Sequence, residues 1–175
     1  MRFSPPLQVL ERGPGGEVSE SPVNVSSRAH TSGKIEFDNL QGERDYSLGM
    51  YGNSKLANIL FPLELTRRLE GTGVTVNALH PGFVATGFAK NNGKIIATLV
   101  SLFAPLVARS PAKGAETSIY LASSPDIEKI TGKYFYDSKV TVTARQATDM
   151  EVAKKLWDVS AEMVHLADAT PRSLN

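Results

Sequence analysis

Three short apolar segments alternate with two longer amphipathic ones, and this order constrains the fold more than any other feature of the sequence. Residues 22–26, 74–79 and 133–136 are rich in β-branched or aromatic side chains, as buried strands are. Residues 53–69 and 111–122 lie between them and carry apolar side chains at helical spacings. A strand–helix–strand–helix–strand order favours parallel pairing with right-handed crossovers. The sequence therefore predicts an α/β fold built on a doubly wound, Rossmann-like parallel sheet.

The remaining segments are expected to flank or connect this unit. Residues 1–21 contain proline and glycine turn signals and are expected to be irregular. Residues 28–47 are polar and are expected to form mainly a loop. A last amphipathic segment, residues 149–166, predicts a helix, and residues 168–175 are expected to be a tail. We therefore predict a single folded domain over residues 22–167.

The composition excludes several classes of function. The 175 residues include no cysteine, so disulfides, thiolate zinc sites and cysteine nucleophiles are excluded. The three histidines, His30, His80 and His165, are far apart in the sequence, and no metal site is predicted. The net charge is +1 without a clustered basic segment, so we expect no nucleic-acid partner.

No segment has the pattern of a secretory signal or of a membrane span. Residues 1–22 lack an apolar core next to basic residues. The most apolar run, residues 95–108, is too short for a span and contains Pro105. We therefore expect a cytoplasmic protein, and a peripheral membrane contact is compatible with the same pattern.

Candidate reactive residues cluster at the expected carboxyl ends of the strands, where doubly wound sheets place their sites. Ser26 and Ser27 follow the first predicted strand, and Pro81-Gly82 follows the second. Tyr51 and Lys55 are four residues apart and share one face of the predicted helix. A phenol exchanges protons poorly at neutral pH, and a nearby ammonium favours its ionised form. The pair is therefore a candidate for acid–base chemistry at a carbonyl or alcohol, with a serine hydroxyl to hold the reacting oxygen.

Each of these features also has a plain structural interpretation when it is taken alone. An exposed tyrosine beside a solvated lysine has the same spacing, and strands often end in small polar residues. Their joint occurrence, in this order, resembles the short-chain dehydrogenase/reductase family over about residues 22–167. The matching segments are residues 23–27 (the serine strand), 51–55 (the Tyr-xxx-Ser/Ala-Lys helix) and 76–86 (the strand and Pro-Gly loop), with residues 37–43 and 54–60 closest to the retinol-dehydrogenase-like branch.

The resemblance implies a catalytic role for three residues. Ser27, the last of the serine pair, would orient and polarise the substrate oxygen. Tyr51 would transfer the proton, and Lys55 would favour the phenolate and hold the ribose of the nicotinamide. The implied reaction is hydride transfer between NADP(H) or NAD(H) and a small apolar alcohol or carbonyl compound.

The resemblance also implies which residues surround the cofactor. Pro81 and Gly82 would shape the loop, the Val84 backbone would meet the carboxamide, and the Thr86 hydroxyl would contact the carboxamide or a phosphate. Tyr51 and Lys55 belong to this set as well. The apolar run over residues 95–107 resembles the variable substrate lobe of the family, and a core-packing or dimer-contact helix explains it equally well.

The sequence departs from the family on its amino-terminal side. Residues 1–26 contain no Thr-Gly-xxx-Gly-x-Gly turn, and the family's Asn-Asn-Ala-Gly segment is also missing. Whole members place on the order of a hundred residues before the serine strand. The resemblance is therefore to the carboxy-terminal portion only, a sheet that lacks its amino-terminal βαβ half. Without the glycine turn the pyrophosphate loses its helix N-terminus, so NADP(H), preferred over NAD(H), would bind weakly or not at all.

Three functions follow from these observations, and the mildest of them is a residual, low-affinity binder of the nicotinamide cofactor. Whether the chain is an active enzyme stays open between the other two. The first is an oxidoreductase of the short-chain type. The second is a truncated, catalytically impaired remnant that acts as an association or regulatory module. In the second case a homo-oligomer is expected, through helix faces or through the sheet edge that the missing strand would leave unpaired.

Overall fold

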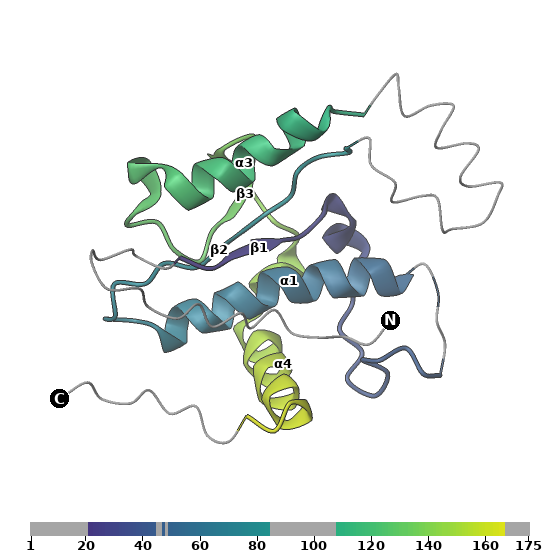
Figure 1. Ribbon diagram of the computed structural model, residues 1–175. Coiled ribbons are helices and arrows are strands. Elements are labelled where there is room, and N and C mark those ends of the chain that lie inside the picture. Colours follow the sequence, from purple (N-terminus) through teal and green to yellow (C-terminus); the bar gives the residue numbers. More distant parts are fainter. Residues whose placement is uncertain (1–20, 45–46, 48, 85–107, 167–175) are drawn as a thin grey trace.

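The computed structural model describes residues 21–44, 47, 49–84 and 108–166, and it places a four-stranded sheet between helices (Figure 1). The strand order is β1-β2-β3-β4, with the first three strands parallel and β4 antiparallel to β3. The predicted α/β class and the parallel pairing are thereby confirmed, whereas residues 1–20 and 167–175 lie outside the described part and the domain limits stay a prediction. The strands are β1 (Val23–Val25), β2 (Asn77–Leu79), β3 (Tyr134–Tyr136) and β4 (Lys139–Val140).

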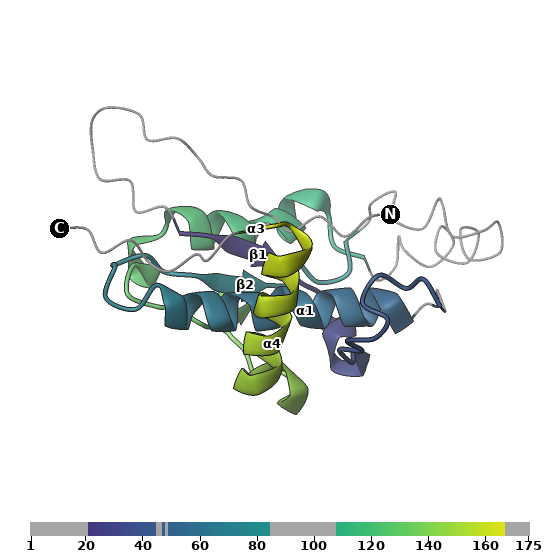
Figure 2. The ribbon, with the colours of Figure 1, turned by 90° about the horizontal axis from the view of Figure 1, so that it is seen from below.

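Helices cover both faces of the sheet. In Figure 1, α3 (Pro111–Ser123) lies above the sheet and α1 (Gly49–Arg68) lies below it. The last helix, α4 (Met150–Met163), crosses α1 on the side away from the sheet, as the view from below in Figure 2 shows. Because both faces are covered, β2 is buried at every residue rather than at alternate ones.

Neighbouring strand residues contribute to two different cores. Ala78 and Tyr134 belong to the core formed with α1 and α4, whereas Leu79 and Phe135 belong to the core formed with α3. This alternation follows from the two-residue repeat of a strand, which sends successive side chains to opposite faces. The first core also contains Leu56, Ala57, Ile59, Leu60, Ala147, Ala153 and Leu156, and the second also contains Leu121 and Ile127.

The helix boundaries follow local capping. The side chain of Ser110 accepts a bond from the N–H of Lys113 at the start of α3, and Asp149 caps α4 in the same way. Helix α1 starts at Gly49, earlier than the residue 53 that the apolar spacing predicts. Tyr51 therefore lies in the first turn of α1, and Lys55 lies one turn further along the same helix.

Some elements, among them the two below, were not anticipated from the sequence. The segment expected to be mainly loop contains a 3₁₀ helix, η1 (Arg28–Ser32), whose N-cap is Ser27. A tight turn at Asp137 and Ser138, with φ of 50° and 57°, joins β3 to β4 as a hairpin. Two successive left-handed residues are the geometry of a type I′ turn, which usually shows in a sequence as Asn-Gly rather than Asp-Ser.

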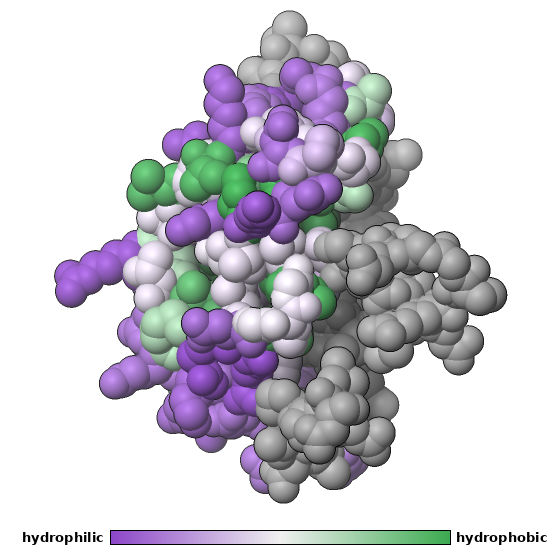
Figure 3. Space-filling view, turned by 90° about the vertical axis from the view of Figure 1, so that its left-hand side faces the viewer, coloured by the Kyte–Doolittle hydropathy of each residue, from purple (hydrophilic) through white to green (hydrophobic). Residues whose placement is uncertain are grey.

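The two ends of the sheet can be located in the figures. The carboxyl ends of β1 and β2 and the start of α1 lie at the right-hand end in Figure 1. The opposite end, seen in Figure 3, is mostly hydrophilic with smaller hydrophobic areas between. Over the described ranges, no helix has both the length and the apolarity that crossing a bilayer requires.

Candidate active site

The candidate residues gather at one end of the sheet. Ser27 lies directly beyond β1, and Pro81 lies directly beyond β2. Tyr51 comes from the first turn of α1, which packs against η1 at this end (Figure 1). The expectation that the serine pair and the Pro-Gly loop follow neighbouring strands is therefore confirmed.

The two serines have different surroundings. Ser26 is buried, and its hydroxyl donates to the carbonyl oxygen of Lys55 at 2.6 Å. Ser27 is half-buried, and its Oγ accepts a bond from the N–H of Ala29 at 3.2 Å. Its carbonyl oxygen accepts from the ring nitrogen Nδ1 of His30 at 2.7 Å. The Ser26 hydrogen bond thus joins the end of β1 to α1. Ser27 begins the turn that follows β1.

Tyr51 and Lys55 contact each other on one face of α1, as their spacing predicts. The Lys55 ammonium nitrogen lies 5.5 Å from the centre of the Tyr51 ring, within the range of a cation–π contact. The same nitrogen makes a long hydrogen bond of 3.4 Å to the carbonyl of Val25, and the Asn58 amide donates to that carbonyl at 3.0 Å. Burial lowers the pKa of the Lys55 ammonium from its ordinary value of 10.5.

A close approach of two glycines brings the serine turn and the tyrosine helix together. A Cβ atom on Gly33 would lie 2.4 Å from the carbonyl oxygen of Gly52, and a Cβ on Gly52 would lie 3.0 Å from the carbonyl oxygen of Ala29. Only glycine fits at such a backbone contact without displacing one of the two elements. Gly52 lies next to Tyr51, so this contact sets the position of the tyrosine relative to the serine turn.

Gly33→Ala is expected to lower the free energy of unfolding by about 1–3 kcal/mol, because the new methyl group overlaps backbone atoms that cannot rotate away. Urea unfolding followed by the fluorescence of Trp157 measures the change. The control is Gly49→Ala in the exposed first turn of α1, where the nearest atom is the Ser47 hydroxyl at 3.3 Å and the expected change is less than about 0.5 kcal/mol. Equal stability of the two variants would contradict a required close approach.

The Pro81–Gly82 loop is held on both sides. Gly82 has a φ of 81°, and its N–H donates to the ring nitrogen Nδ1 of His80 at 3.1 Å. Val84 forms an isolated parallel β-bridge with Arg109 and packs against Gly114 of α3, where a Cβ would lie 2.5 Å from the valine side chain.

Two further predictions concern residues that the structure does not describe. Thr86 lies outside the described residues, as do residues 95–107. The predicted role of Thr86 and both interpretations of the apolar run therefore stay predictions.

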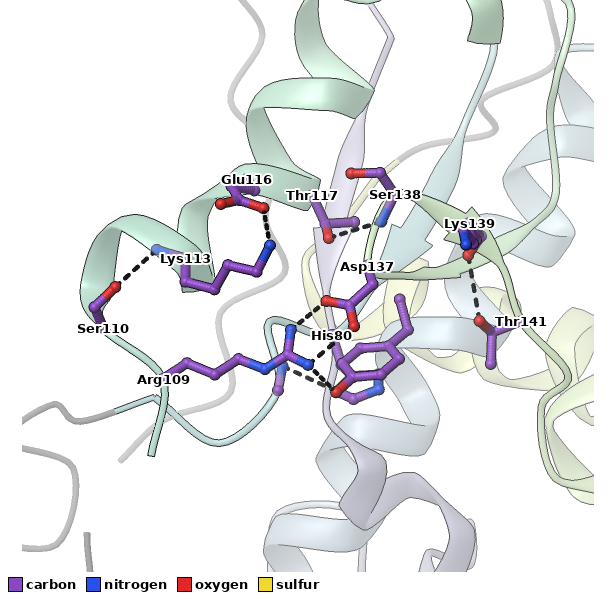
Figure 4. A network of polar contacts seen from close by, with 12 residues as sticks. His80, Arg109, Ser110, Lys113, Glu116, Thr117, Asp137, Ser138, Lys139 and Thr141 are labelled. Atoms are coloured by element: carbon purple, nitrogen blue, oxygen red, sulfur yellow. Dashed lines mark hydrogen bonds and ion pairs between the residues drawn. The ribbon is translucent and has the colours of Figure 1, made fainter. Parts of the chain in front are cut away.

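Sequence reasoning missed a network that supports this loop. The Arg109 guanidinium contacts the Asp137 carboxylate and the Tyr136 hydroxyl, next to His80 (Figure 4). The pKa of Asp137 is held below its ordinary value by the hydrogen bond from Arg109. The sequence contains one indication of this network, since His80 directly precedes the Pro81-Gly82 pair that it supports. Within the part of the chain that the structure describes, no three His, Asp or Glu side chains are grouped as metal ligands.

Comparison with known proteins identifies relatives of the chain. No protein-family model matches the chain. Retinol dehydrogenase 14 from Homo sapiens is 48% identical over 147 residues, which cover 82% of this chain and 44% of that protein. Retinol dehydrogenase 12 from Homo sapiens is 45% identical over 143 residues, covering 81% of this chain and 45% of that protein. The chain is a homologue of the retinol dehydrogenases and corresponds to part of a short-chain dehydrogenase/reductase.

A solved structure supports the same assignment. An uncharacterised protein from Mycobacterium paratuberculosis superposes with a TM-score of 0.59 at 27% sequence identity, covering 82% of this chain and 49% of that one. The chain therefore spans less than half of the length of the retinol dehydrogenases cited above and about half of this structural neighbour. Its fold is consistent with part of the Rossmann-like fold of the family.

Proposed function

We propose that this chain provides the proton-transfer part of an oxidoreductase that moves a hydride between NADP(H) or NAD(H) and an apolar alcohol or carbonyl compound. The observation that carries the proposal is the Lys55 ammonium beside the Tyr51 ring, in the helix that packs against the turn starting at Ser27. The names of the retinol dehydrogenases point to a retinoid-type alcohol or aldehyde as the substrate class.

Ser27 is suited to holding the substrate oxygen. Its Oγ accepts one bond from the N–H of Ala29, and its own proton has no acceptor among the described residues. The hydroxyl proton of Ser26, in contrast, is donated to the Lys55 carbonyl. Ser27 can therefore donate to an oxygen that gains negative charge during reduction. This difference supports Ser27 over Ser26 as the residue that contacts substrate.

Tyr51 is suited to proton transfer at the same oxygen. Its side chain is 37% exposed at the end of the sheet where the Pro-Gly loop also lies, so a substrate can reach the phenol. The phenol would give its proton to the oxygen in reduction and take one from the alcohol in oxidation. The Lys55 ammonium beside this ring is the cation that the family resemblance pairs with the phenol.

The residues around the loop fit the nicotinamide end of a dinucleotide. The half-buried Lys55 ammonium makes only a long hydrogen bond to a backbone carbonyl in the described part, so it can turn toward ribose hydroxyls. Pro81 and Gly82 would shape the pocket wall, and the backbone of Val84 would meet the carboxamide. When bound, the nicotinamide supplies or accepts the hydride, which no side chain can do. NADP(H) is proposed ahead of NAD(H), following the family resemblance.

The proposal is tested by measuring reduction of retinaldehyde with NADPH, with retinol quantified by chromatography. The chain is assayed alone and mixed with the amino-terminal half of a retinol dehydrogenase supplied as a separate polypeptide. Retinol formation that depends on this chain in either assay supports the proposal. No retinol in both assays, although a correctly folded chain is shown by circular dichroism, contradicts it.

A second proposal is favoured by the edge of the sheet, namely an association or regulatory module. β1 is the terminal strand of the described sheet, and the buried Nδ2 of Asn24 has no hydrogen-bond partner among the described residues. Val25 at the end of the same strand is 47% exposed. Such an edge can pair with a strand from a second copy. Light scattering over a range of concentrations tests this proposal, and a monomer at every concentration contradicts it. A cytoplasmic location belongs to both proposals.

A further inference from the structure

His80 connects β2 to the Pro81–Gly82 loop, and its ring stacks with two tyrosines of β3. The residue is 9% exposed. Its ring centre lies 4.2 Å from that of Tyr136 with the planes 3° apart, and 5.7 Å from that of Tyr134 with the planes 19° apart. The His80 N–H also donates to the Phe135 carbonyl at 3.0 Å. The two ring contacts restrict the rotation of the imidazole and thereby the directions of its nitrogen atoms.

One nitrogen of this ring supports the loop. The N–H of Gly82 donates to Nδ1 of His80 at 3.1 Å. Since Nδ1 accepts this bond, the imidazole is neutral and carries its proton on Nε2. Protonation of Nδ1 would replace the acceptor by a donor and would remove the bond.

Arg109 holds the following residues of the same loop. Its backbone N–H donates to the carbonyl of Phe83 at 2.8 Å, and it forms the β-bridge with Val84. Its guanidinium lies 4.6 Å from the centre of the Tyr136 ring and donates to the Asp137 carboxylate at 2.9 Å (Figure 4). The guanidinium thus covers the outer tyrosine of the stack, and the loop is held at two points, one of which depends on a titratable ring.

We propose that His80 is a positioning residue for the Pro81–Gly82 loop, and that protonation of His80 releases this loop. The link to catalysis rests on the proposed function, in which the loop shapes the nicotinamide site. The hydrogen bond itself does not depend on that function. His80 acts through Gly82 and is not placed against substrate.

The surroundings of His80 set the pH at which this release occurs. The charged or titratable groups that face it, besides the two tyrosines, are His30, Arg28, Arg109 and Asp137. Burial of the ring lowers the pKa of His80 below its ordinary 6.5, the nearby His30 and arginines lower it further, and Asp137 acts in the opposite direction. The unfolded chain therefore binds this proton more readily than the folded one. The stabilisation from neutral His80 is complete above pH 6.5 and is lost as the pH falls from there through the lower pKa of the folded protein.

Two substitutions separate the hydrogen bond from the stacking. His80→Asn places an amide oxygen near the position of Nδ1, and this oxygen accepts a bond without titrating. His80→Phe keeps an aromatic ring in the stack and has no acceptor. His165→Asn, at an exposed histidine in the segment after α4, is the matched control. The readouts are the ¹H–¹⁵N amide signal of Gly82 as a function of pH and the Kd for NADPH.

In the unmodified protein, the Gly82 amide signal is expected to shift in one step with a midpoint below pH 6.5. His80→Asn should keep the signal of the hydrogen-bonded state at every pH, and His80→Phe should give the signal of the released state at every pH. At neutral pH, His80→Phe should raise the Kd for NADPH roughly three- to tenfold, the change expected from the loss of one hydrogen bond. His80→Asn should leave this Kd unchanged. His165→Asn should behave as the unmodified protein does.

The positioning role is overturned if the Gly82 signal does not follow the titration of His80, or if it is the same in His80→Phe as in the unmodified protein. It is also overturned if NADPH binds the unmodified protein and His80→Phe with equal affinity. If the amide signals behave as expected and NADPH binds to neither protein, even when the amino-terminal half is supplied, the proposed function fails while the positioning of Gly82 by His80 stands.

Discussion

Tyr51→Phe is expected to reduce carbonyl turnover by a factor of about 10²–10⁴ while leaving the Kd for NADPH nearly unchanged. The change removes one hydroxyl group and leaves the ring beside the Lys55 ammonium, so the packing of α1 is preserved. What is lost is the only proton donor that the proposal places at the reacting oxygen. The loss should therefore affect the chemical step and not the binding of the cofactor.

The measurement compares kcat and KM for retinaldehyde reduction in whichever assay of the unmodified protein gives activity. Tyr120→Phe is the matched control, because Tyr120 loses the same hydroxyl on α3, where its ring packs against the core on the other side of the sheet. Its kcat should stay at the unmodified value. If Tyr51→Phe keeps full activity, another group transfers the proton and the assignment of Tyr51 is wrong.

The architecture was largely predictable because it follows from local patterns. Strands with two buried faces have continuous apolar runs, and helices between them have apolar side chains on one side, so strand order and parallel pairing could be inferred. The boundaries were less predictable. Helix α1 starts at Gly49 rather than at residue 53. Its first turns contact η1, and no capping motif in the sequence marks this start.

The candidate site was predictable only in part, because part of it depends on residues that are distant in the sequence. Ser27, Tyr51 and Lys55 could be placed from motif order and helix spacing. The support of the Pro-Gly loop could not be predicted, because His80 and Arg109 are linked through Tyr136 and Asp137, which follow α3 in the chain. The left-handed Asp137–Ser138 turn, which points a carboxylate at that arginine, has no strong sequence signal either.

Glu64 illustrates a second limit of sequence patterns. A charged residue in an amphipathic helix is expected to face water, yet Glu64 is fully buried. Arg67 and Arg68 of the same helix both pair with its carboxylate, at 2.7 and 2.8 Å, and the hydrogen bond from Arg67 is the main reason that the pKa of Glu64 is lowered. Arg68 also reaches across to Asp158 of α4. The charges and the helix over residues 149–166 were both visible in the sequence, but the packing of that helix across α1 was not.

Phe135→Ala is expected to lower the free energy of unfolding by about 3–5 kcal/mol. Phe135 is 2% exposed and packs in the core of Leu79, Leu121 and Ile127 between β3 and α3. Its removal leaves a cavity lined by side chains of a strand and a helix that are held in place by the sheet, so the space can close only in part. A loss of this size is a large fraction of the stability of an ordinary domain.

Urea unfolding followed by the fluorescence of Trp157 measures this loss at a distance from the mutated site, because that ring stacks on Phe61 between α1 and α4 on the other side of the sheet. Val142→Ala is the control, since Val142 is 93% exposed and its truncation should change stability by less than about 0.5 kcal/mol. Because Trp157 and Phe135 lie on opposite sides of the sheet, a lower midpoint of the Trp157 transition in Phe135→Ala would mean that the two sides unfold together. A Phe135→Ala transition unchanged from that of Val142→Ala would contradict the packing of α3 on the sheet, and with it the position of Val84 and the Pro-Gly loop.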